Sequence, residues 1–276
     1  MARPSGDTSK RADMVVSVHP LTQDIPLRIL NFLDSDGKSR NEGRTTPFAT
    51  VVTDLGGAHP TWFNPGVDSC FVPSDALYQC ALDRKVRPEQ IVQHGLPIRR
   101  GFWADQSSGT SSSSSSSGSG NFFGDLLASF GGGGKDASAS GDVGATNGGE
   151  KSRIRDSLGL LQGLPTVLIV GGGDGMGGII EQANALGDKL NSEAASSGND
   201  DEPSFQMVVV CGKNESAEKK LSAKTWGKGV SVEVKGFVNN MDEWMRSSDV
   251  IVTKAGPGTI AEASICGLPC MLSSYL

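Results

Sequence analysis

The sequence lacks any apolar run that approaches the roughly 20 residues needed to span a bilayer. Any attachment to a membrane is therefore expected to be peripheral. The first dozen residues carry Arg3, Lys10 and Arg11 but have no apolar centre of a secretory signal. This stretch is also too short for a convincing transit peptide, so the sequence itself shows no targeting signal.

Cysteine and histidine are scarce as well. The chain has only three histidines, and its cysteines form no Cys-x-x-Cys pair that would predict a zinc site. We therefore expect no metal centre. Scattered free thiols are typical of a reducing compartment. The five cysteines are Cys70, Cys80, Cys211, Cys266 and Cys270.

Basic residues do not predominate, because 25 Lys and Arg face 31 Asp and Glu, which gives a formal net charge of −6 and a pI near 5.1. A nucleic-acid-binding protein usually presents a basic face, so we expect no nucleic-acid partner. Contact with a membrane is not excluded, since local basic patches decide it. The chain also lacks a G-x-x-x-x-G-K-[ST] motif, which argues against a P-loop ATPase.

Short apolar runs alternate with helical patterns along most of the chain, which predicts an α/β fold with parallel sheets covered on both faces. The helical pattern over residues 20–33 contains Pro26, where we expect an interruption or kink. The runs that predict strands are 14–18, 48–53, 67–72, 91–94, 165–170, 205–211, 230–234, 250–253 and 270–272.

Residues 104–150 interrupt this alternation with serine and glycine tracts that cannot bury enough apolar surface to order themselves. The island 121–130 is either a short amphipathic helix that touches lipid or protein, or part of a disordered linker. We therefore predict two partial Rossmann-like domains, 1–103 and 151–276, separated by a low-complexity linker at 104–150.

A candidate anion site lies in the segment 253–263, between an apolar strand pattern and a helical pattern. Unpaired N–H groups at a helix start, together with the helix dipole, favour an anion there. Gly256 and Gly258 allow close approach of the backbone, and Pro257 suits the first helical turn. These residues are equally compatible with ordinary turn chemistry.

Three other side chains of this segment complete the interpretation. Lys254 adds a cation, and the Thr259 hydroxyl suits a phosphate oxygen. Glu262 lies one turn further along the helix, where a carboxylate would repel phosphate but suits a pair of ribose hydroxyls. The segment therefore predicts a nucleotide site, with a glutamate on a solvated helix face as the alternative.

A second glycine loop, residues 173–178, satisfies G-x-G-x-x-G between a strand and a helix, which is also compatible with a dinucleotide-dependent dehydrogenase. That fingerprint needs an acidic residue at the end of the next strand to hold the ribose. The next strand ends in Cys211-Gly212-Lys213, without a carboxylate. The dehydrogenase interpretation is therefore disfavoured.

Six blocks in the same order resemble the glycosyltransferases that include the bacterial lipid II-forming N-acetylglucosaminyltransferase and, more closely, the plant monogalactosyldiacylglycerol (MGDG) synthases. The resemblance covers nearly all of the chain except residues 104–150 and two smaller polar insertions. The blocks are 17–21, 52–63, 95–99, 171–177, 235–238 and 254–262.

The resemblance implies the GT-B fold, in which two Rossmann-like domains face a cleft, and UDP-galactose as the donor without a tightly bound cofactor or metal. It places the uracil at Phe237 and Val238, with backbone groups reading the base edge, although Phe237 alone is also compatible with a core position. The implied donor-binding residues are Gly172, Gly173, Phe237, Val238, Lys254, Gly256, Pro257, Gly258, Thr259 and Glu262.

The resemblance also places one loop on the acceptor side, where Trp62 and Phe63 are expected to meet lipid. His59 in this loop is either a base, a donor to an anion, or a turn-stabilising imidazole. His19 matches the family without a clear role, and His94 is treated as structural. The implied acceptor-side residues are His59, Pro60, Thr61 and Trp62.

The implied reaction is inverting transfer of galactose from UDP-galactose to 1,2-diacylglycerol. The alternatives are a related UDP-glucose or UDP-N-acetylglucosamine transferase, or a catalytically dead nucleotide- or lipid-binding fragment. The family's proposed base lies in a loop upstream of this chain, so no catalytic residue is assigned. We expect an incomplete copy, inactive or poor alone, at the plastid envelope, with oligomers possible.

Overall fold

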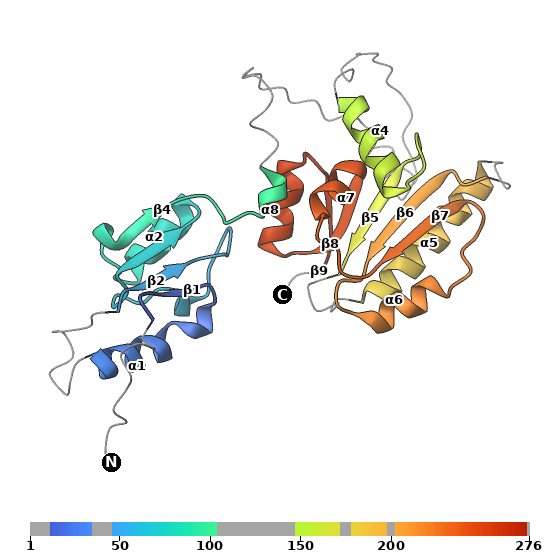
Figure 1. The fold of residues 1–276 in the computed structure, drawn as a ribbon. Coiled ribbons are helices and arrows are strands. Elements are labelled where there is room, and N and C mark those ends of the chain that lie inside the picture. The colour runs from blue at the N-terminus through green and yellow to red at the C-terminus, as the bar shows by residue number, and fades with distance from the viewer. Residues whose placement is uncertain (1–11, 35–45, 104–146, 172–177, 198–201, 275–276) are drawn as a thin grey trace. The chain divides into compact units, whose positions relative to one another are not determined.

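A computed structural model describes residues 12–34, 46–103, 147–171, 178–197 and 202–274 (Figure 1). Contacts divide the chain into unit 1, Met1–Pro97, and unit 2, Ile98–Leu276. Each unit contains one sheet with all strands parallel, which confirms the predicted α/β class with two parallel sheets. The low-complexity stretch 104–146, including the 121–130 island, lies outside the described residues.

Unit 1 is built on a sheet with the strand order β1-β2-β3-β4. Its core lies between this sheet, the helices and the loop after β2, and includes Phe48, Trp62 and Leu77. The elements are β1 (Val15–Ser17), α1 (Asp24–Asp34), β2 (Phe48–Val51), β3 (Ser69–Val72), α2 (Asp75–Asp83) and β4 (Ile91–Gln93), with 3-10 turns at Pro20–Thr22, Pro60–Trp62 and Pro88–Gln90.

The expected interruption at Pro26 is wrong. The predicted single helix is instead a 3-10 turn, Pro20–Thr22, followed by the separate helix α1. Pro26 lies in the first turn of α1, where a missing N–H removes no intrahelical hydrogen bond. Helix α2 begins as predicted after Ser74, whose Oγ accepts from the N–H of Leu77 at 3.4 Å.

Unit 2 is built on a five-stranded sheet with the order β7-β6-β5-β8-β9. Helix α6 ends at Ser222, earlier than the predicted Trp226, whose indole folds back and donates to the carbonyl of Leu221 at 3.3 Å. The elements are α4 (Asn147–Leu158), β5 (Thr166–Val170), α5 (Ile179–Ser196), β6 (Phe205–Val210), α6 (Glu215–Ser222), β7 (Val230–Lys235), α7 (Met241–Ser247), β8 (Val250–Lys254), α8 (Pro257–Ile265) and β9 (Cys270–Ser274).

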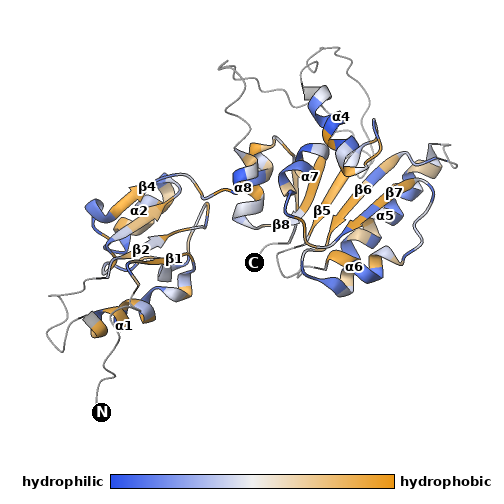
Figure 2. Ribbon diagram, viewed as in Figure 1, coloured by the Kyte–Doolittle hydropathy of each residue, from blue (hydrophilic) through white to orange (hydrophobic). Residues whose placement is uncertain are grey.

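The central strands of unit 2 are mostly apolar because both faces of the sheet are covered (Figure 2). Side chains alternate along β5, so Val167 and Ile169 pack in the core with α5 and α6. Leu168 packs in the opposite core, with α7 and α8. This two-sided covering explains why the strands read as continuous apolar runs in the sequence.

Residues 98–103, expected at the end of the first domain, belong to unit 2. Phe102 is buried in the core formed with Leu160, Met241 and Trp244, which holds this segment on unit 2. Helix α4 begins at Asn147, a few residues before the expected start of the second domain. The division into two partial domains and a linker stays a prediction.

Candidate functional site

The order of the strands in unit 2 creates a crevice at one edge of its sheet. The central strand β5 pairs with β6 on one side and with β8 on the other. In open parallel sheets, ligands bind outside the carboxyl ends of the strands where the order reverses in this way. A cavity of about 210 Å³ lies at this position, lined by Arg99, Val170, Gly171, Val210, Gly212, Phe237, Val238, Met241, Thr253, Lys254 and Thr259.

Backbone forms much of the cavity wall after β5 and β6. The N–H of Gly171 donates to the carbonyl of Val210 at 3.1 Å, which continues the sheet pairing to the start of the glycine loop. Gly212 has a φ of 60°, a left-handed conformation that favours glycine. The predicted donor residues Gly172 and Gly173 lie outside the described residues.

The segment after β8 forms the predicted strand, loop and helix start. Helix α8 begins at Pro257, and its cap residue Gly256 provides no side-chain hydrogen bond to the first turn. A Cβ added at Gly258 would meet nothing within 4 Å, so this turn is open. The first N–H groups of α8 have no intrahelical acceptor, and with the helix dipole they favour an anion.

The cavity is cationic although the chain as a whole is acidic. Among the described residues that line it, Arg99 and Lys254 are the ionisable ones, and none of these described residues is a carboxylate. The formal charge of the whole chain is −6. The two formal positive charges are therefore local to the cavity, and that of Arg99 is paired with the carboxylate of Glu262 on α8.

Glu262 does not line this cavity. Its side chain is 7% exposed, and its two oxygens accept from Arg99 Nε at 2.6 Å and Arg99 Nη2 at 2.5 Å. The hydrogen bond to Glu262 raises the pKa of Arg99 further above its ordinary value, against the opposing effect of burial. The carboxylate of Glu262, which was predicted to bind the ribose hydroxyls, is therefore hydrogen-bonded to the guanidinium of Arg99 in this structure.

Phe237 and Val238 both line the cavity, as expected for the segment assigned to the uracil. The side chain of Phe237 is not a core residue, because Phe237 is 64% exposed. Val238 packs against the buried core on the α7 side of the sheet. An exposed ring beside a partly buried valine leaves the backbone between them accessible from the cavity.

His59 lies in unit 1, in the loop after β2, and caps the 3-10 turn Pro60–Trp62. Its Nδ1 accepts from the N–H of Thr61 at 3.3 Å and lies 2.8 Å from Thr61 Oγ1. His19 caps the turn Pro20–Thr22 in the same way, with Nδ1 accepting from Leu21 at 3.2 Å. The turn-stabilising role is therefore what the structure shows.

This geometry decides which proton transfers His59 can perform. A neutral imidazole that accepts at Nδ1 carries its proton on Nε2. With the cap intact, the outward nitrogen is therefore a hydrogen-bond donor and has no lone pair for general-base catalysis. His59, Pro60 and Thr61 are all exposed at the surface of unit 1.

The expectation that Trp62 and Phe63 meet lipid is corrected by their burial. Trp62 is 1% exposed, and its Nε1 donates to Asp54 Oδ2 at 2.7 Å. Phe63 is buried in the same core. Both rings therefore pack in the core of unit 1 and are not exposed at its surface. His94 stacks on Phe71 with ring centroids 6.3 Å apart, in keeping with a structural role.

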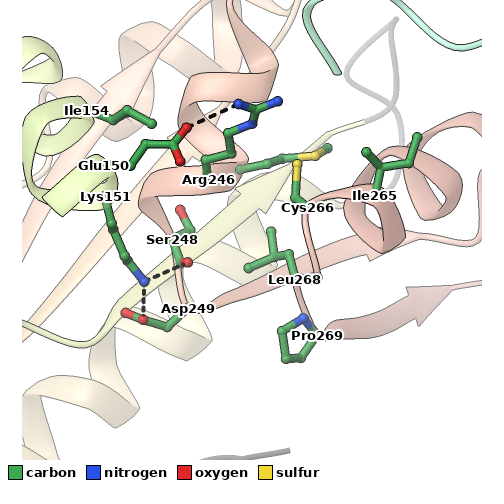
Figure 3. Close-up of a pocket in the computed structure, with 12 residues that line it drawn as sticks. Glu150, Lys151, Ile154, Arg246, Ser248, Asp249, Ile265, Cys266, Leu268 and Pro269 are labelled. Carbon is green, nitrogen blue, oxygen red and sulfur yellow. Dashed lines mark hydrogen bonds and ion pairs between the residues drawn. The ribbon is translucent and has the colours of Figure 1, made fainter. Parts of the chain in front are cut away.

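A larger cavity, of about 590 Å³, lies at the opposite edge of the sheet of unit 2, around the start of β8 (Figure 3). Lys151 reaches from α4 to the carbonyl of Ser248 at 3.0 Å and pairs with Asp249. Glu150 pairs with Arg246 at 3.3 Å. These contacts attach α4 to the sheet, and no sequence motif singled them out.

The described residues offer neither a cluster of metal ligands nor a membrane-spanning helix. They contain no group of three or more histidine, cysteine, aspartate or glutamate side chains placed to hold a metal ion. Nor is any helix in the described ranges long and apolar enough to cross a membrane.

Two family models match the chain. Residues 8–98 match the monogalactosyldiacylglycerol (MGDG) synthase family, and residues 166–273 match the glycosyltransferase family 28 C-terminal domain. The first match covers most of unit 1, and the second covers the sheet of unit 2 and the cavity-lining residues from Val170 to Thr259.

Curated proteins and a solved structure are also similar to the chain. The probable chloroplastic MGDG synthase of Glycine max is 38% identical over 264 residues, which are 96% of this chain and 39% of the relative. The chloroplastic MGDG synthase of Spinacia oleracea is 37% identical and is covered to 40%. Among solved structures, Anabaena Alr3699/HepE in complex with UDP-glucose matches 94% of this chain and 58% of its own, with 12% identity and a TM-score of 0.43.

The chain spans about two fifths of the length of the curated relatives that it matches. Within that span, the similarity is continuous across both units and includes the cavity-lining segments of unit 2. The chain is thus similar to MGDG synthases over 96% of its length, with an amino-terminal part matched by that family and a carboxyl-terminal part matched by glycosyltransferase family 28.

Proposed function

We propose that this chain forms the donor-binding part of an enzyme that transfers galactose from UDP-galactose to 1,2-diacylglycerol with inversion. The observation that carries the proposal is the cationic cavity at the start of α8, which lies at the reversal point of the sheet. The names of the relatives supply the reaction, and the reaction belongs to the whole protein because the chain matches only part of each relative.

The diphosphate of the donor is proposed to lie against the first turn of α8. Gly256 and Gly258 leave this turn open, Pro257 begins the helix, Thr259 contributes a hydroxyl, and Lys254 contributes a charge. The uracil then lies beside Phe237 and Val238 on the other wall of the same cavity. Gly172 and Gly173, which lie outside the described residues, stay predicted donor-binding residues.

This placement explains how the site assists the reaction. The bond from the acceptor oxygen to the sugar C1 forms while the bond from C1 to the β-phosphate oxygen breaks, and the electron pair leaves with UDP. Negative charge therefore develops on the diphosphate, next to the N–H groups of α8 and Lys254. Fixed donors at this position stabilise the leaving group without requiring a tightly held metal.

The acceptor and the location in the cell are inferred from the relatives. Their printed names place the relatives in the chloroplast, so we propose peripheral association with the plastid envelope, whether the enzyme is monomeric or oligomeric. On the acceptor side, His59, Pro60 and Thr61 are proposed as the exposed edge of the loop, and Trp62 as its buried support. The base that removes the proton of the diacylglycerol hydroxyl is not assigned to this chain.

The test is calorimetric titration of the 276-residue chain with UDP and UDP-galactose. Lys254→Ala and Thr259→Val should each weaken UDP binding by about 5- to 50-fold, as expected for one charged or neutral hydrogen bond to an anion. Lys219→Ala is the matched control, because Lys219 lies on α6 and does not line the cavity. Unchanged UDP affinity in both site variants would refute the donor site.

The same titrations separate the alternatives. Competition with UDP-glucose and UDP-N-acetylglucosamine ranks the sugars, and tighter binding of either one would replace galactose in the proposal. Incorporation of labelled galactose into diacylglycerol is then measured with this chain and with a full-length relative as the positive control. UDP binding without transfer by this chain would support a binding fragment over an active enzyme.

A further inference from the structure

We propose that the cavity of about 590 Å³ between α4, α7 and the end of α8 is a docking groove for the chain's own apolar segment 121–130. This groove lies at the edge of the sheet opposite the cationic cavity, so it is separate from the proposed donor site. Segment 121–130 lies outside the described residues, and it enters here only through its sequence and its place in the chain.

Part of the groove is apolar and continuous with the core of unit 2. Met245 and Leu268 are 1% and 6% exposed and pack in the core on the side of α7 and α8. Ile265, at the end of α8, also lines the groove but is 40% exposed. Figure 3 shows Ile265 and Leu268 on one side and Ile154 of α4 on the other. Apolar side chains that line an open cavity in this way favour apolar groups as occupants.

The charged side chains of the groove already have partners. Glu150 pairs with Arg246 at 3.3 Å. Lys151 pairs with Asp249 and donates to the carbonyl of Ser248 at 3.0 Å. Because each cation is compensated by a carboxylate, the groove attracts a further charged ligand only weakly. The expected occupant is therefore apolar, with few charges of its own.

Segment 121–130 has this composition. It contains five large apolar residues and one charged residue, Asp125, in a stretch that is otherwise rich in serine and glycine. The apolar positions 122, 123, 126, 127 and 130 fit the spacing of one helix face. A cavity of about 150 Å³ holds one benzene ring, so the groove of about 590 Å³ has room for about three such side chains. The segment thus matches the groove in chemistry and in size.

Both ends of the stretch that carries the segment are attached beside the groove. On the amino-terminal side, the carbonyl of Gly101 accepts from Arg246 Nη2 at 3.4 Å, and Phe102 is buried in the same core as Leu268. On the carboxyl-terminal side, Arg246 pairs with Glu150 in the first turn of α4. Arg246 therefore contacts both ends, and it also lines the groove.

The lengths of chain on either side allow the segment to return to the groove. Residues 104–120 precede it and residues 131–146 follow it, which are 17 and 16 residues. Glycine- and serine-rich chains of this length have a root-mean-square span of about 20–25 Å. Glu150 lies only about 5 Å along the helix from the start of α4. Tethers of this length give an effective concentration of about 1 mM, so even weak docking is populated.

Photocrosslinking of the 276-residue chain tests the proposal. The photoreactive residue p-benzoylphenylalanine replaces Phe123, and mass spectrometry identifies the crosslinked peptides. Crosslinks to residues 150–154 and 265–269 are expected, and mixing isotope-labelled with unlabelled protein should show that they form within one chain. The same residue in place of Ser113, in the serine tract, is the control and should give several-fold fewer of these crosslinks.

A change in the groove should reduce the same crosslinks. Ile265→Ser removes an exposed apolar side chain that lines the groove, so the yield from position 123 should fall by about 2- to 10-fold. Leu161→Ser is the matched control, because Leu161 is 43% exposed in unit 2 but does not line the groove. It should leave the yield unchanged. Thermal melting verifies that both variants are folded.

The native thiol of Cys266 provides a second measurement, because Cys266 lines the groove and Cys270 does not. The triple variant Phe122→Ser/Phe123→Ser/Phe130→Ser should raise the rate of alkylation of Cys266 relative to Cys270 by about 2- to 10-fold. This range corresponds to a dissociation constant of about 0.1–1 mM at an effective concentration of about 1 mM. An unchanged ratio of the two rates contradicts docking.

The other outcomes also decide the matter. Crosslinks from position 123 that fall outside the groove, or an equal yield from position 113, overturn the proposal. Crosslinks between a labelled and an unlabelled chain assign the groove to a second copy and overturn docking within one chain. Crosslinks to lipid in phosphatidylcholine vesicles, with none to the groove in their absence, assign the segment to a membrane and overturn the proposal as well.

Discussion

Asp249 is expected to be a principal determinant of the stability of unit 2. It precedes β8, and its Oδ2 accepts from the N–H of Thr166 at 2.7 Å and from Arg155 Nη2 at 3.1 Å, while Oδ1 pairs with Lys151. It therefore joins helix α4 to the starts of β5 and β8. The perturbation is Asp249→Asn, which keeps an oxygen acceptor but removes the charge.

The magnitude follows from the surroundings of Arg155. Its side chain is 6% exposed, so removal of the Asp249 charge leaves a buried guanidinium without an anionic partner. Breaking such a pair costs about 3–5 kcal/mol. Arg155 keeps two neutral acceptors, the carbonyl of Ser247 and the hydroxyl of Thr166, each at 2.9 Å, and Asp249 is 29% exposed. We therefore expect Asp249→Asn to lower the free energy of unfolding by about 3 kcal/mol, the lower end of that range.

The assay is urea denaturation followed by tryptophan fluorescence, with Trp226 and Trp244 as reporters inside unit 2. A loss of about 3 kcal/mol corresponds to a fall of about 6–12 °C in the melting temperature. Asp188→Asn is the control, because Asp188 is 75% exposed and pairs with Lys224 at the surface. That control should change stability by less than about 1 kcal/mol. A loss below about 1 kcal/mol for Asp249→Asn would refute the reasoning.

Three further changes follow from packing and burial. Trp62→Phe removes the 2.7 Å hydrogen bond to Asp54 and should lower the free energy of unfolding of unit 1, measured in urea, by about 1–2 kcal/mol. An unchanged free energy would show that this hydrogen bond does not form. Gly187→Ala puts a Cβ 2.5 Å from the ring of Trp226, so a loss of about 1–3 kcal/mol is expected despite the better helix propensity. Burial raises the pKa of the Cys211 thiol to about 11 from 9.0, so the thiol loses its proton at lower pH in the unfolded state than in the folded state. Between pH 9 and pH 11 the free energy of unfolding of the wild type should therefore fall by about 2–3 kcal/mol relative to that of Cys211→Ala. A difference between the two proteins that does not change with pH would contradict this.

The sheets were predictable because their chemistry is local. Strands of a parallel sheet that is covered on both faces are apolar along most of their length, so runs such as 205–211 are visible without any structure. The loop and helix start at Gly256 and Pro257 were predictable for the same reason, since turn and first-turn residues act within a few positions. The features of the site that the sequence predicted are thus those determined by residues close together in the sequence.

The parts that were missed depend on distant partners. Arg99 and Glu262 are 163 positions apart, so the ion pair between them is not visible in the sequence. The burial of Trp62 depends on Asp54 and on the core of unit 1. Aromatic residues in a loop are equally compatible with a lipid surface and with a core, and only tertiary packing decides between them. The one available signal for Arg99 was its position in a block shared with the MGDG synthases.

The walls of the cavity come from segments between positions 99 and 259 of the chain, and they are brought together by strand pairing in the sheet and by the core that contains Phe102. Contacts this far apart in sequence form late, because closing long loops costs entropy before any contact repays it. UDP should therefore bind only molecules in which unit 2 has folded completely. At a free concentration of 100 times its dissociation constant, UDP would stabilise that state by about 2.7 kcal/mol, so nucleotide affinity also measures how much of a preparation is correctly folded.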